Sequence, residues 1–269
     1  CADHGNVVCG FSYVFERAIT ITDNGTLDVN NTAISDVIMP YKELYDATKH
    51  GFVNALMDDD DGFIRNAFFC FNHDGNIEYS FDAAVYLAYA RAKGFEPQIP
   101  DGTAYTFRYS GNVGDYENIS LCDVLDGTVP AEAFDGCIVL VGAYAAGMMD
   151  SYYVPVDRSQ QMYGVEIHAN AIQALIDGKY VVKIPSWISG LITAVLAAVL
   201  AYICGNLSVV KTVLVCAGTI AVKLAVGYFA FDIAGYSGDI IVFPTAVLLI
   251  MIYYVAVHYY LANRSKKRI

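Results

Sequence analysis

The sequence predicts an α/β domain, with a layered mixed sheet and flanking helices, followed by a three-helix all-α transmembrane region. Strand-like and helix-like runs mix over residues 1–185 without strict alternation. The same residues carry 26 of the 28 Asp and Glu but only 10 of the 16 Lys and Arg. From residue 187 the chain is almost continuously apolar, in three stretches long enough to cross a bilayer.

The first hundred residues predict strands joined by polar turns. Residues 6–15 are rich in β-branched and aromatic side chains, which is typical of a strand. Residues 21–36 predict a polar loop with a turn at Asn24-Gly25, and residues 41–49 a short helix. Runs at 50–57, at 63–71 and after Asp74-Gly75 predict a three-strand meander, since acidic and glycine-containing turns separate them.

The next elements lead to the predicted centre of the domain. Residues 80–92 predict a helix with Ser80 as its cap and Gly94 as its stop, followed by a strand at 103–109 and a short helix at 120–125. The apolar run 137–141 predicts a central strand buried on both faces. After a loop, a helix is expected from residue 163 to residue 177, and Gly178 ends it.

Three membrane spans are predicted, at about 187–204, 209–231 and 240–261. The expected division is an extracytoplasmic domain at 1–185, the spans at 186–262 and a basic cytoplasmic tail at 263–269. Lys211 and the basic tail lie at one end of the spans, and Asp232 and Asp239 lie at the other. The positive-inside rule therefore places residues 1–185 outside the plasma membrane and the tail inside.

The charge balance limits the partners. Residues 1–185 have a net charge of −16, from 10 basic and 26 acidic groups, and residues 186–269 have +4. Such an acidic domain argues against nucleic acid, because nothing neutralises phosphates. The lipid bilayer is the partner that the three spans require.

Several kinds of functional site are not expected, because the residues that they require are missing from the sequence. Gly142 and Gly147 have the spacing of a phosphate loop, but Met148 stands where that loop needs Lys. No dinucleotide fingerprint and no hydrolase nucleophile motif is present, so we expect no catalytic residues, no enzyme activity in this chain and no cofactor. Without a CxxC pair, a structural zinc site is not expected either.

Cysteines are predicted to pack rather than to react. Cys9, Cys70 and Cys137 lie in apolar, strand-like runs, which favours small buried thiols. One disulfide is a further possibility in an oxidising compartment, but the cysteine spacing does not indicate which two residues would form it.

The acidic run at residues 58–61 invites a calcium interpretation. With Gly62 as the loop glycine of an EF-hand, Met57 takes the first ligand position and Phe68 the twelfth, so the motif fails and no metal is predicted. An irregular cation site stays open beside the simpler interpretation, a solvated turn. Arg65, four residues after Asp61, is expected to pair with it.

Polar residues around the last predicted helix form a second candidate group. Asp150, Glu166, His168 and Asn170 flank one loop–helix junction and could converge there. Each could instead be a satisfied structural residue that holds the junction's geometry, with ligand contact as the alternative. Lys223, inside the second span, predicts either snorkelling or a helix contact, and a functional charge is the less supported alternative.

Several segments resemble a known family. The segments 120–127, 134–150 and 163–178 match it closely, and the last is the most specific. A G-x-x-N segment followed by D-x-D-G-x-x-R also matches, with Gly51, Asn54, Asp59, Asp61, Gly62 and Arg65 in place. Over most of residues 5–180 the chain resembles the type-2 CHASE domain, an extracellular sensory domain associated with nucleotide cyclases and histidine kinases.

The resemblance implies one departure from the family, an output domain and a function. The family's usual N-terminal anchor, first strand and first helix are not in this sequence, so an N-terminally truncated domain lacking part of the sheet is expected. The resemblance implies that an output domain, a cyclase or a kinase in relatives, takes the place after Ile269. The resemblance implies a sensory input module that binds an extracellular ligand or protein of unknown identity. It would relay the signal through the spans to a cytoplasmic output domain in cis. Paired outputs would favour a homodimer.

The acidic turn and the loop–helix junction together give the candidate residues, and one alternative function is kept. The ligand-binding or signal-junction candidates are Asp59, Asp61, Arg65, Asp150, Glu166, His168 and Asn170. The alternative function is a membrane-anchored assembly or adhesion protein with no signalling output.

Overall fold

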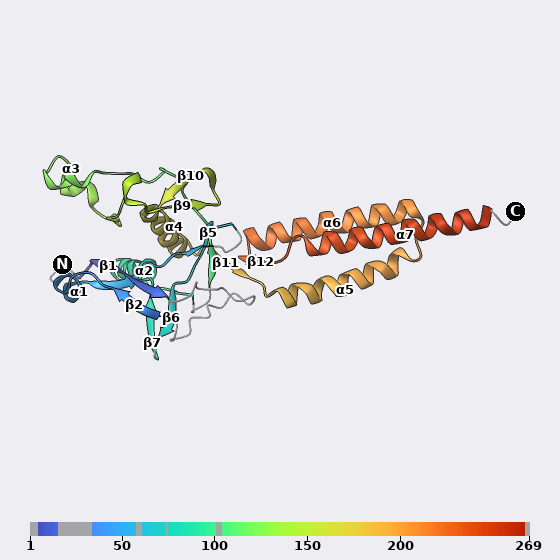
Figure 1. The fold of residues 1–269 in the computed structure, drawn as a ribbon, viewed down its shortest axis with the longest axis horizontal. Coiled ribbons are helices and arrows are strands. Elements are labelled where there is room, and N and C mark those ends of the chain that lie inside the picture. Colours follow the sequence, from blue (N-terminus) through green and yellow to red (C-terminus); the bar gives the residue numbers. More distant parts are fainter. Residues whose placement is uncertain (1–4, 16–33, 58–60, 74, 101–103, 267–269) are drawn as a thin grey trace. The chain divides into compact units, whose positions relative to one another are not determined.

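The computed structural model describes residues 5–15, 34–57, 61–73, 75–100 and 104–266 (Figure 1). The chain divides into two compact units, an N-terminal unit that ends at Tyr180 and a C-terminal unit that begins at Val181. The first is a mixed α/β unit with several small sheets, and the second contains three long apolar helices. The predicted fold class is therefore confirmed, although small sheets replace one continuous layered sheet.

The first sheet has β1 (Val8–Phe15) at its centre. Strand β2 (Ile34–Ile38) pairs with β1 antiparallel, and β3 (Lys49–Phe52) pairs with it parallel. Helix α1 (Lys42–Ala47) lies in the connection between them. Aromatic side chains bury the inner face, because Phe11, Tyr13, Phe52, Phe68 and Phe71 form one cluster. The turn predicted at Asn24-Gly25 lies outside the described residues.

The predicted strand at 63–71 is two strands. Strand β5 (Ile64–Ala67) pairs with β4 (Leu56–Met57) and with β8 (Tyr105–Phe107), both antiparallel. Strand β6 (Cys70–His73) forms a hairpin with β7 (Asn76–Tyr79), as the Asp-Gly pair predicts. Phe68 and Phe69 are both buried between β5 and β6, although neighbouring side chains of one strand point to opposite faces. The chain therefore leaves one sheet there and enters another.

Helix α2 (Phe81–Lys93) has the predicted ends. The Ser80 hydroxyl accepts a hydrogen bond from the Ala83 N–H at 3.1 Å, and Gly94 closes the helix with φ of +74°. Gly51 of β3 approaches the start of α2 so closely that a Cβ there would lie 2.5 Å from the Ser80 carbonyl oxygen. This glycine lets β3 and α2 lie together.

The prediction of a strand at residues 137–141 is wrong. After α3 (Leu121–Leu125) and two short 3-10 turns, η2 (Ala131–Phe134) and η3 (Ala146–Met148), no strand is formed before residue 151. Val139 is 53% exposed, Val141 is 78% exposed and Cys137 is exposed. In the described part of the chain no neighbouring strand supplies a hydrogen-bond ladder to this run, so its apolar character alone does not bury it.

A hairpin takes the place expected to be a loop. Strand β9 (Ser151–Val154) pairs antiparallel with β10 (Asp157–Tyr163), and helix α4 (Gly164–Asp177) follows directly. Val154 and Met162 are fully buried against Ile167 and Ala171 of α4. Gly178, with φ of +64°, ends α4 where the sequence predicts.

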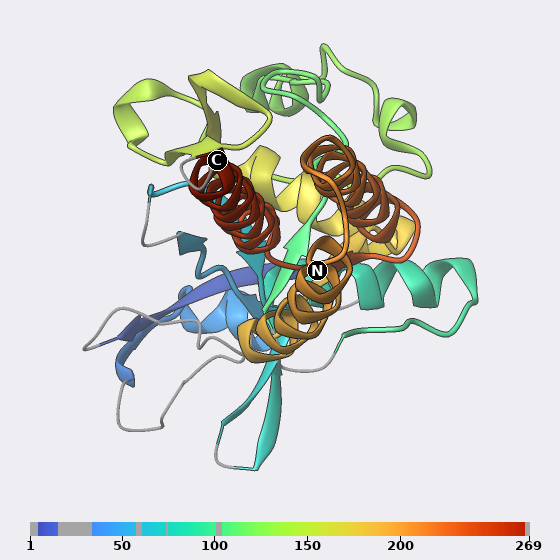
Figure 2. The ribbon, with the colours of Figure 1, turned by 90° about the vertical axis from the view of Figure 1, so that its right-hand side faces the viewer.

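The C-terminal unit holds the apolar helices α5 (Ser186–Cys204), α6 (Val209–Asp232) and α7 (Val242–Lys266), which Figure 2 shows nearly end-on. Each is long and apolar enough to cross a membrane, over Ser186–Cys204, Val209–Asp232 and Val242–Leu261. Helix α7 packs against both others, and its Tyr254 hydroxyl donates to the Ala201 carbonyl oxygen of α5 at 2.7 Å. Strand β11 (Tyr180–Lys183), before α5, pairs parallel with β12 (Tyr236–Ser237), between α6 and α7.

Candidate functional site

The polar residues predicted around one junction all lie on α4 or at its start, but they face different neighbours. Glu166 and Asn170 are one helical turn apart and face the loop after β8. His168, between them in sequence, faces α2 instead. Residues two apart on a helix point in very different directions, so this division follows from the helical repeat. These side chains therefore point to different sides of α4 and do not form one pocket.

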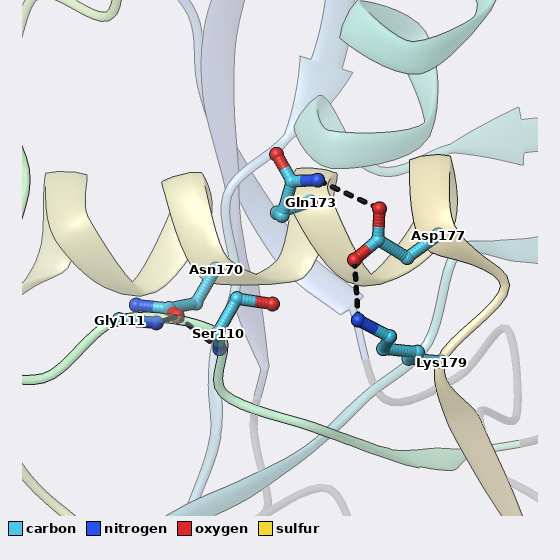
Figure 3. Close-up of polar contacts among 6 residues, drawn as sticks. All are labelled: Ser110, Gly111, Asn170, Gln173, Asp177 and Lys179. Carbon is cyan, nitrogen blue, oxygen red and sulfur yellow. Dashed lines mark hydrogen bonds and ion pairs between the residues drawn. The ribbon is translucent and has the colours of Figure 1, made fainter.

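Asn170 is fully buried and uses both ends of its amide. Its Oδ1 accepts hydrogen bonds from the backbone N–H groups of Ser110 and Gly111, both at 2.9 Å (Figure 3). Its Nδ2 donates to the Glu166 carbonyl oxygen at 3.0 Å and to the Met162 sulfur at 3.5 Å. One buried amide therefore fixes the loop after β8 against α4.

Glu166 holds the same loop one turn earlier. This side chain is buried, and its Oε1 accepts from the Gly114 N–H at 2.9 Å and from the Tyr144 hydroxyl at 3.4 Å. The other carboxyl oxygen, Oε2, is buried with no hydrogen-bond partner among the described residues. Burial and the nearby Glu166 charge raise the pKa of Tyr116. A buried carboxyl oxygen without a hydrogen-bond partner costs folding free energy, so the burial of Glu166 is only partly compensated.

Asp150 lies at the N-terminal end of α4. Its backbone carbonyl accepts from the Gly164 N–H at 3.0 Å, and a Cβ on Gly164 would lie 2.6 Å from either carboxyl oxygen. Burial, together with the charge and hydrogen bond of Asp150, raises the pKa of Tyr152. A carboxylate at this position is stabilised by the positive end of the helix dipole. Glycine at the first helical position makes the close approach feasible.

His168 joins α4 to α2 through Asp82, a residue that the sequence analysis did not select. The His168 Nδ1 and the Asp82 Oδ1 are 2.7 Å apart, and the side chains are 23% and 9% exposed. The Phe81 ring meets the imidazole edge-on, with the centroids 5.3 Å apart. A carboxylate on an otherwise apolar stretch of α2, just after the Ser80 cap, is the signal that could have identified Asp82.

The electrostatics of His168 favour its charged form. Burial alone would lower the pKa of this imidazole, but the Asp82 charge and hydrogen bond and the Asp150 charge outweigh burial, so the pKa is raised. The imidazole therefore keeps its proton to a higher pH than a histidine in solution.

A small cavity adjoins the His168–Asp82 pair. Its volume is about 30 Å³, which is room for one or two water molecules and too little for a metabolite. Asn54, Asn66 and Ser80 supply further polar groups to its wall. The remaining wall is apolar, and consists of Phe52, Ala55, Ile64, Ala67, Phe68, Phe107, Ile167 and Ala171.

Asp61 and Arg65 form the predicted pair at the start of β5. The guanidinium bonds both carboxyl oxygens, at 2.7 and 2.6 Å, and lies 4.9 Å from the centroid of the Phe63 ring. The Arg65 hydrogen bond holds the pKa of Asp61 down, at about 2. Asp59 lies outside the described residues. The pair joins Asp61 to β5, whereas the other candidates among the described residues lie on α4 or at its start.

Cation and thiol chemistry has little support in the described part of the chain. Within it, no group of three or more His, Cys, Asp or Glu side chains has the arrangement to hold a metal ion. Among the cysteines in it, Cys70 is buried, Cys9 is half-buried, and Cys122 and Cys137 are exposed. The prediction that Cys137 is buried is therefore wrong, because the run that contains it forms no strand.

Fold and sites together define a class of protein, a mixed α/β domain that continues directly into three candidate membrane spans. The sequence model of the CHASE2 domain family matches residues 3–203. The chain belongs to this family of sensory domains, which confirms the resemblance found in the sequence. Neither the curated proteins nor the solved structures contain a match.

Proposed function

We propose that this chain is the extracytoplasmic input module of a membrane signal-transduction receptor. The single observation that carries the proposal is that, in a chain of a sensory family, the N-terminal α/β unit is followed within a few residues by three helices able to cross a membrane. An external signal or partner binds the N-terminal unit, and the spans relay its presence. The chain itself needs no catalysis for this role.

The orientation rests on charge. Lys211 and the basic residues after 263 lie at one end of the spans, whereas Asp232 and Asp239 lie at the other. Under the positive-inside rule the acidic N-terminal unit is extracytoplasmic and the C-terminal end is cytoplasmic. A cytoplasmic output domain in cis, of the nucleotide cyclase or protein kinase class, would receive the signal. Because such outputs work as pairs, a homodimer is the expected assembly.

The relay follows the chain from α4. This helix ends at Gly178, and only β11 and Pro185 separate it from α5. Its N-terminal half is fixed by the contacts of Asp150, Glu166 and Asn170. A signal that binds one arrangement of this helix better than another shifts the population of the two arrangements, and chain continuity passes the shift to α5.

Crosslinking between the spans tests the relay. Single cysteines are introduced on facing positions of α5 and α7 in the full-length protein, and disulfide formation is measured with and without the signal. A changed pattern supports the relay. Identical patterns under all stimuli that alter the output would sink it.

A second candidate function has one observation in its favour. The segment from α3 to η3 exposes large apolar side chains, including Leu121, Leu125, Val139, Val141, Met148 and Met149. Exposed apolar surface is typical of contact surfaces, so the N-terminal unit could serve assembly or adhesion without signalling. The full-length reading frame separates the two, because a cyclase or kinase domain after the spans supports signalling and a stop codon supports assembly.

A further inference from the structure

We infer that His168 and Asp82 form a proton-binding site, and that proton occupancy sets how firmly α4 packs on α2. The proton is then a ligand of the N-terminal unit in its own right. As a sensory stimulus this inference rests on the proposed function, because α4 is the helix that leads toward the spans. The site itself rests only on the geometry within the N-terminal unit.

The pair connects two helices that are far apart in sequence. Helices α2 and α4 pack against each other, and the 2.7 Å contact joins the first turn of α2 to the first half of α4. Asp82 is 9% exposed at its side chain and His168 is 23% exposed. A histidine so placed is shielded from most of the solvent yet still accessible to protons.

The surroundings of the imidazole contain few other charges. From α2 it faces Asp82, and from the segment before β9 it feels Asp150. Strand β10 also packs on α4, but none of its described charged groups acts on the ring. The cavity beside the pair is lined otherwise by neutral side chains. One carboxylate, that of Asp82, therefore contacts the imidazole, and the charge of a second, that of Asp150, also acts on it.

The sign of the pH effect follows from the direction of the shift. The folded-state pKa of His168 is raised above the unfolded value of about 6.5. The stabilising contribution is therefore fully present below about pH 6.5 and is lost as the pH rises through the folded pKa. Above that point Asp82 becomes a buried carboxylate without a counter-charge, which destabilises the contact between α2 and α4.

The cavity can hold water that stabilises the state in which His168 is deprotonated. With room for one or two waters, and with Asn54, Asn66 and Ser80 in its wall, it can hydrate Asp82 when the imidazole becomes neutral. Proton release thus exchanges a charge-assisted contact between helices for hydration of one of them. The site responds to a rise in pH, not to acidification.

Titration of His168 is the first test. The full chain in lipid nanodiscs, with isotope-labelled histidine, is titrated by NMR from about pH 5 to about pH 9, and His168→Gln assigns its signal. We expect a His168 pKa above about 6.5, and a fall of about one unit or more in Asp82→Asn, which removes the neighbouring charge. His50→Gln, which removes an imidazole stacked on Tyr45 elsewhere, should leave the His168 pKa unchanged. A wild-type value at or below about 6.5 overturns the inference, whether or not the variants fold.

Hydrogen exchange is the second test. After correction for the intrinsic pH dependence, amides of α2 and α4 should lose protection several-fold as the pH rises through the His168 pKa. In His168→Gln the loss should disappear, because glutamine keeps a donor but does not titrate. Protection that falls equally in both proteins overturns the inference. Span crosslinks that ignore pH while His168 titrates would count against the relay alone.

Discussion

At the scale of single residues, Asn170 is the polar side chain on which the loop after β8 depends. Substitution to alanine leaves the N–H groups of Ser110 and Gly111 without their acceptor. We expect Asn170→Ala to lower the free energy of unfolding of the N-terminal unit by about 1–3 kcal/mol. Near-UV circular dichroism during thermal unfolding of the full chain measures this loss.

Gln173 supplies the matched control. It lies on the same helix, and its amide donates a hydrogen bond to the Asp177 carboxylate at 2.8 Å. The same carboxylate also pairs with Lys179 (Figure 3). Gln173→Ala should change the free energy of unfolding by no more than about 0.5 kcal/mol. Equal losses in the two variants would mean that the Asn170 amide does not fix the loop.

The Asp61–Arg65 pair gives a second prediction at this scale. The pKa of Asp61 is about 2 because Arg65 bonds both of its oxygens. In Arg65→Ala we expect this pKa to rise toward its ordinary value of 3.8, measured by NMR titration of the carboxyl group. Asp126, whose pKa is lowered by Thr128, should not move. An unchanged Asp61 pKa would assign its depression to the turn and not to Arg65.

At the scale of elements, the contact between β3 and α2 depends on a glycine. A Cβ on Gly51 would lie 2.5–2.6 Å from backbone atoms of Ser80 and Phe81, which cannot move without displacing the start of α2. We expect Gly51→Ala to cost about 1–3 kcal/mol of unfolding free energy. Loss of exchange protection in the first turn of α2 would locate the damage.

Gly147 is the control for the same substitution. It lies in η3, where an added Cβ meets nothing within 4 Å and where φ is not positive. Gly147→Ala should therefore be close to neutral. If it destabilises as much as Gly51→Ala, close packing is not the reason that β3 needs glycine.

At the scale of the whole molecule, the proposed orientation predicts which positions react from outside the cell. Each variant of the full-length protein contains one cysteine only, either native Cys122 or an introduced one, and is labelled in intact cells. Tyr236→Cys, between α6 and α7, and Cys122, both exposed, should react with an impermeant maleimide. Arg264→Cys, near the end of α7, should react only after permeabilisation. The reverse pattern would invert the proposed orientation.

The predicted fold and the observed one differ where a segment forms a strand only by pairing with a strand distant in sequence. Helices were placed within a few residues, since caps such as Ser80 and stops such as Gly94 and Gly178 are local signals. The apolar run at 137–141 has the composition of a strand but lacks a paired neighbour, whereas the more polar hairpin of β9 and β10 was missed. Strand identity depends on partners distant in sequence, which composition does not reveal.

The candidate site shows the same division. The Asp61–Arg65 pair was predictable because its members are four residues apart. Asp82 was not, because 86 residues separate it from His168 and only the packing of α2 on α4 brings them together. The sequence also grouped Glu166, His168 and Asn170, and only the structure separated them onto two sides of one helix.

By itself the sequence determined the division into an acidic mixed α/β unit and three apolar helices, because charge and hydropathy are properties of each segment. It also determined the family, because the motifs from residue 51 onward are local. The tertiary structure alone decided which strands pair, that residues 137–141 stay exposed, and that His168 meets Asp82. These features depend on contacts between segments distant in sequence, and such contacts form only when the chain is folded.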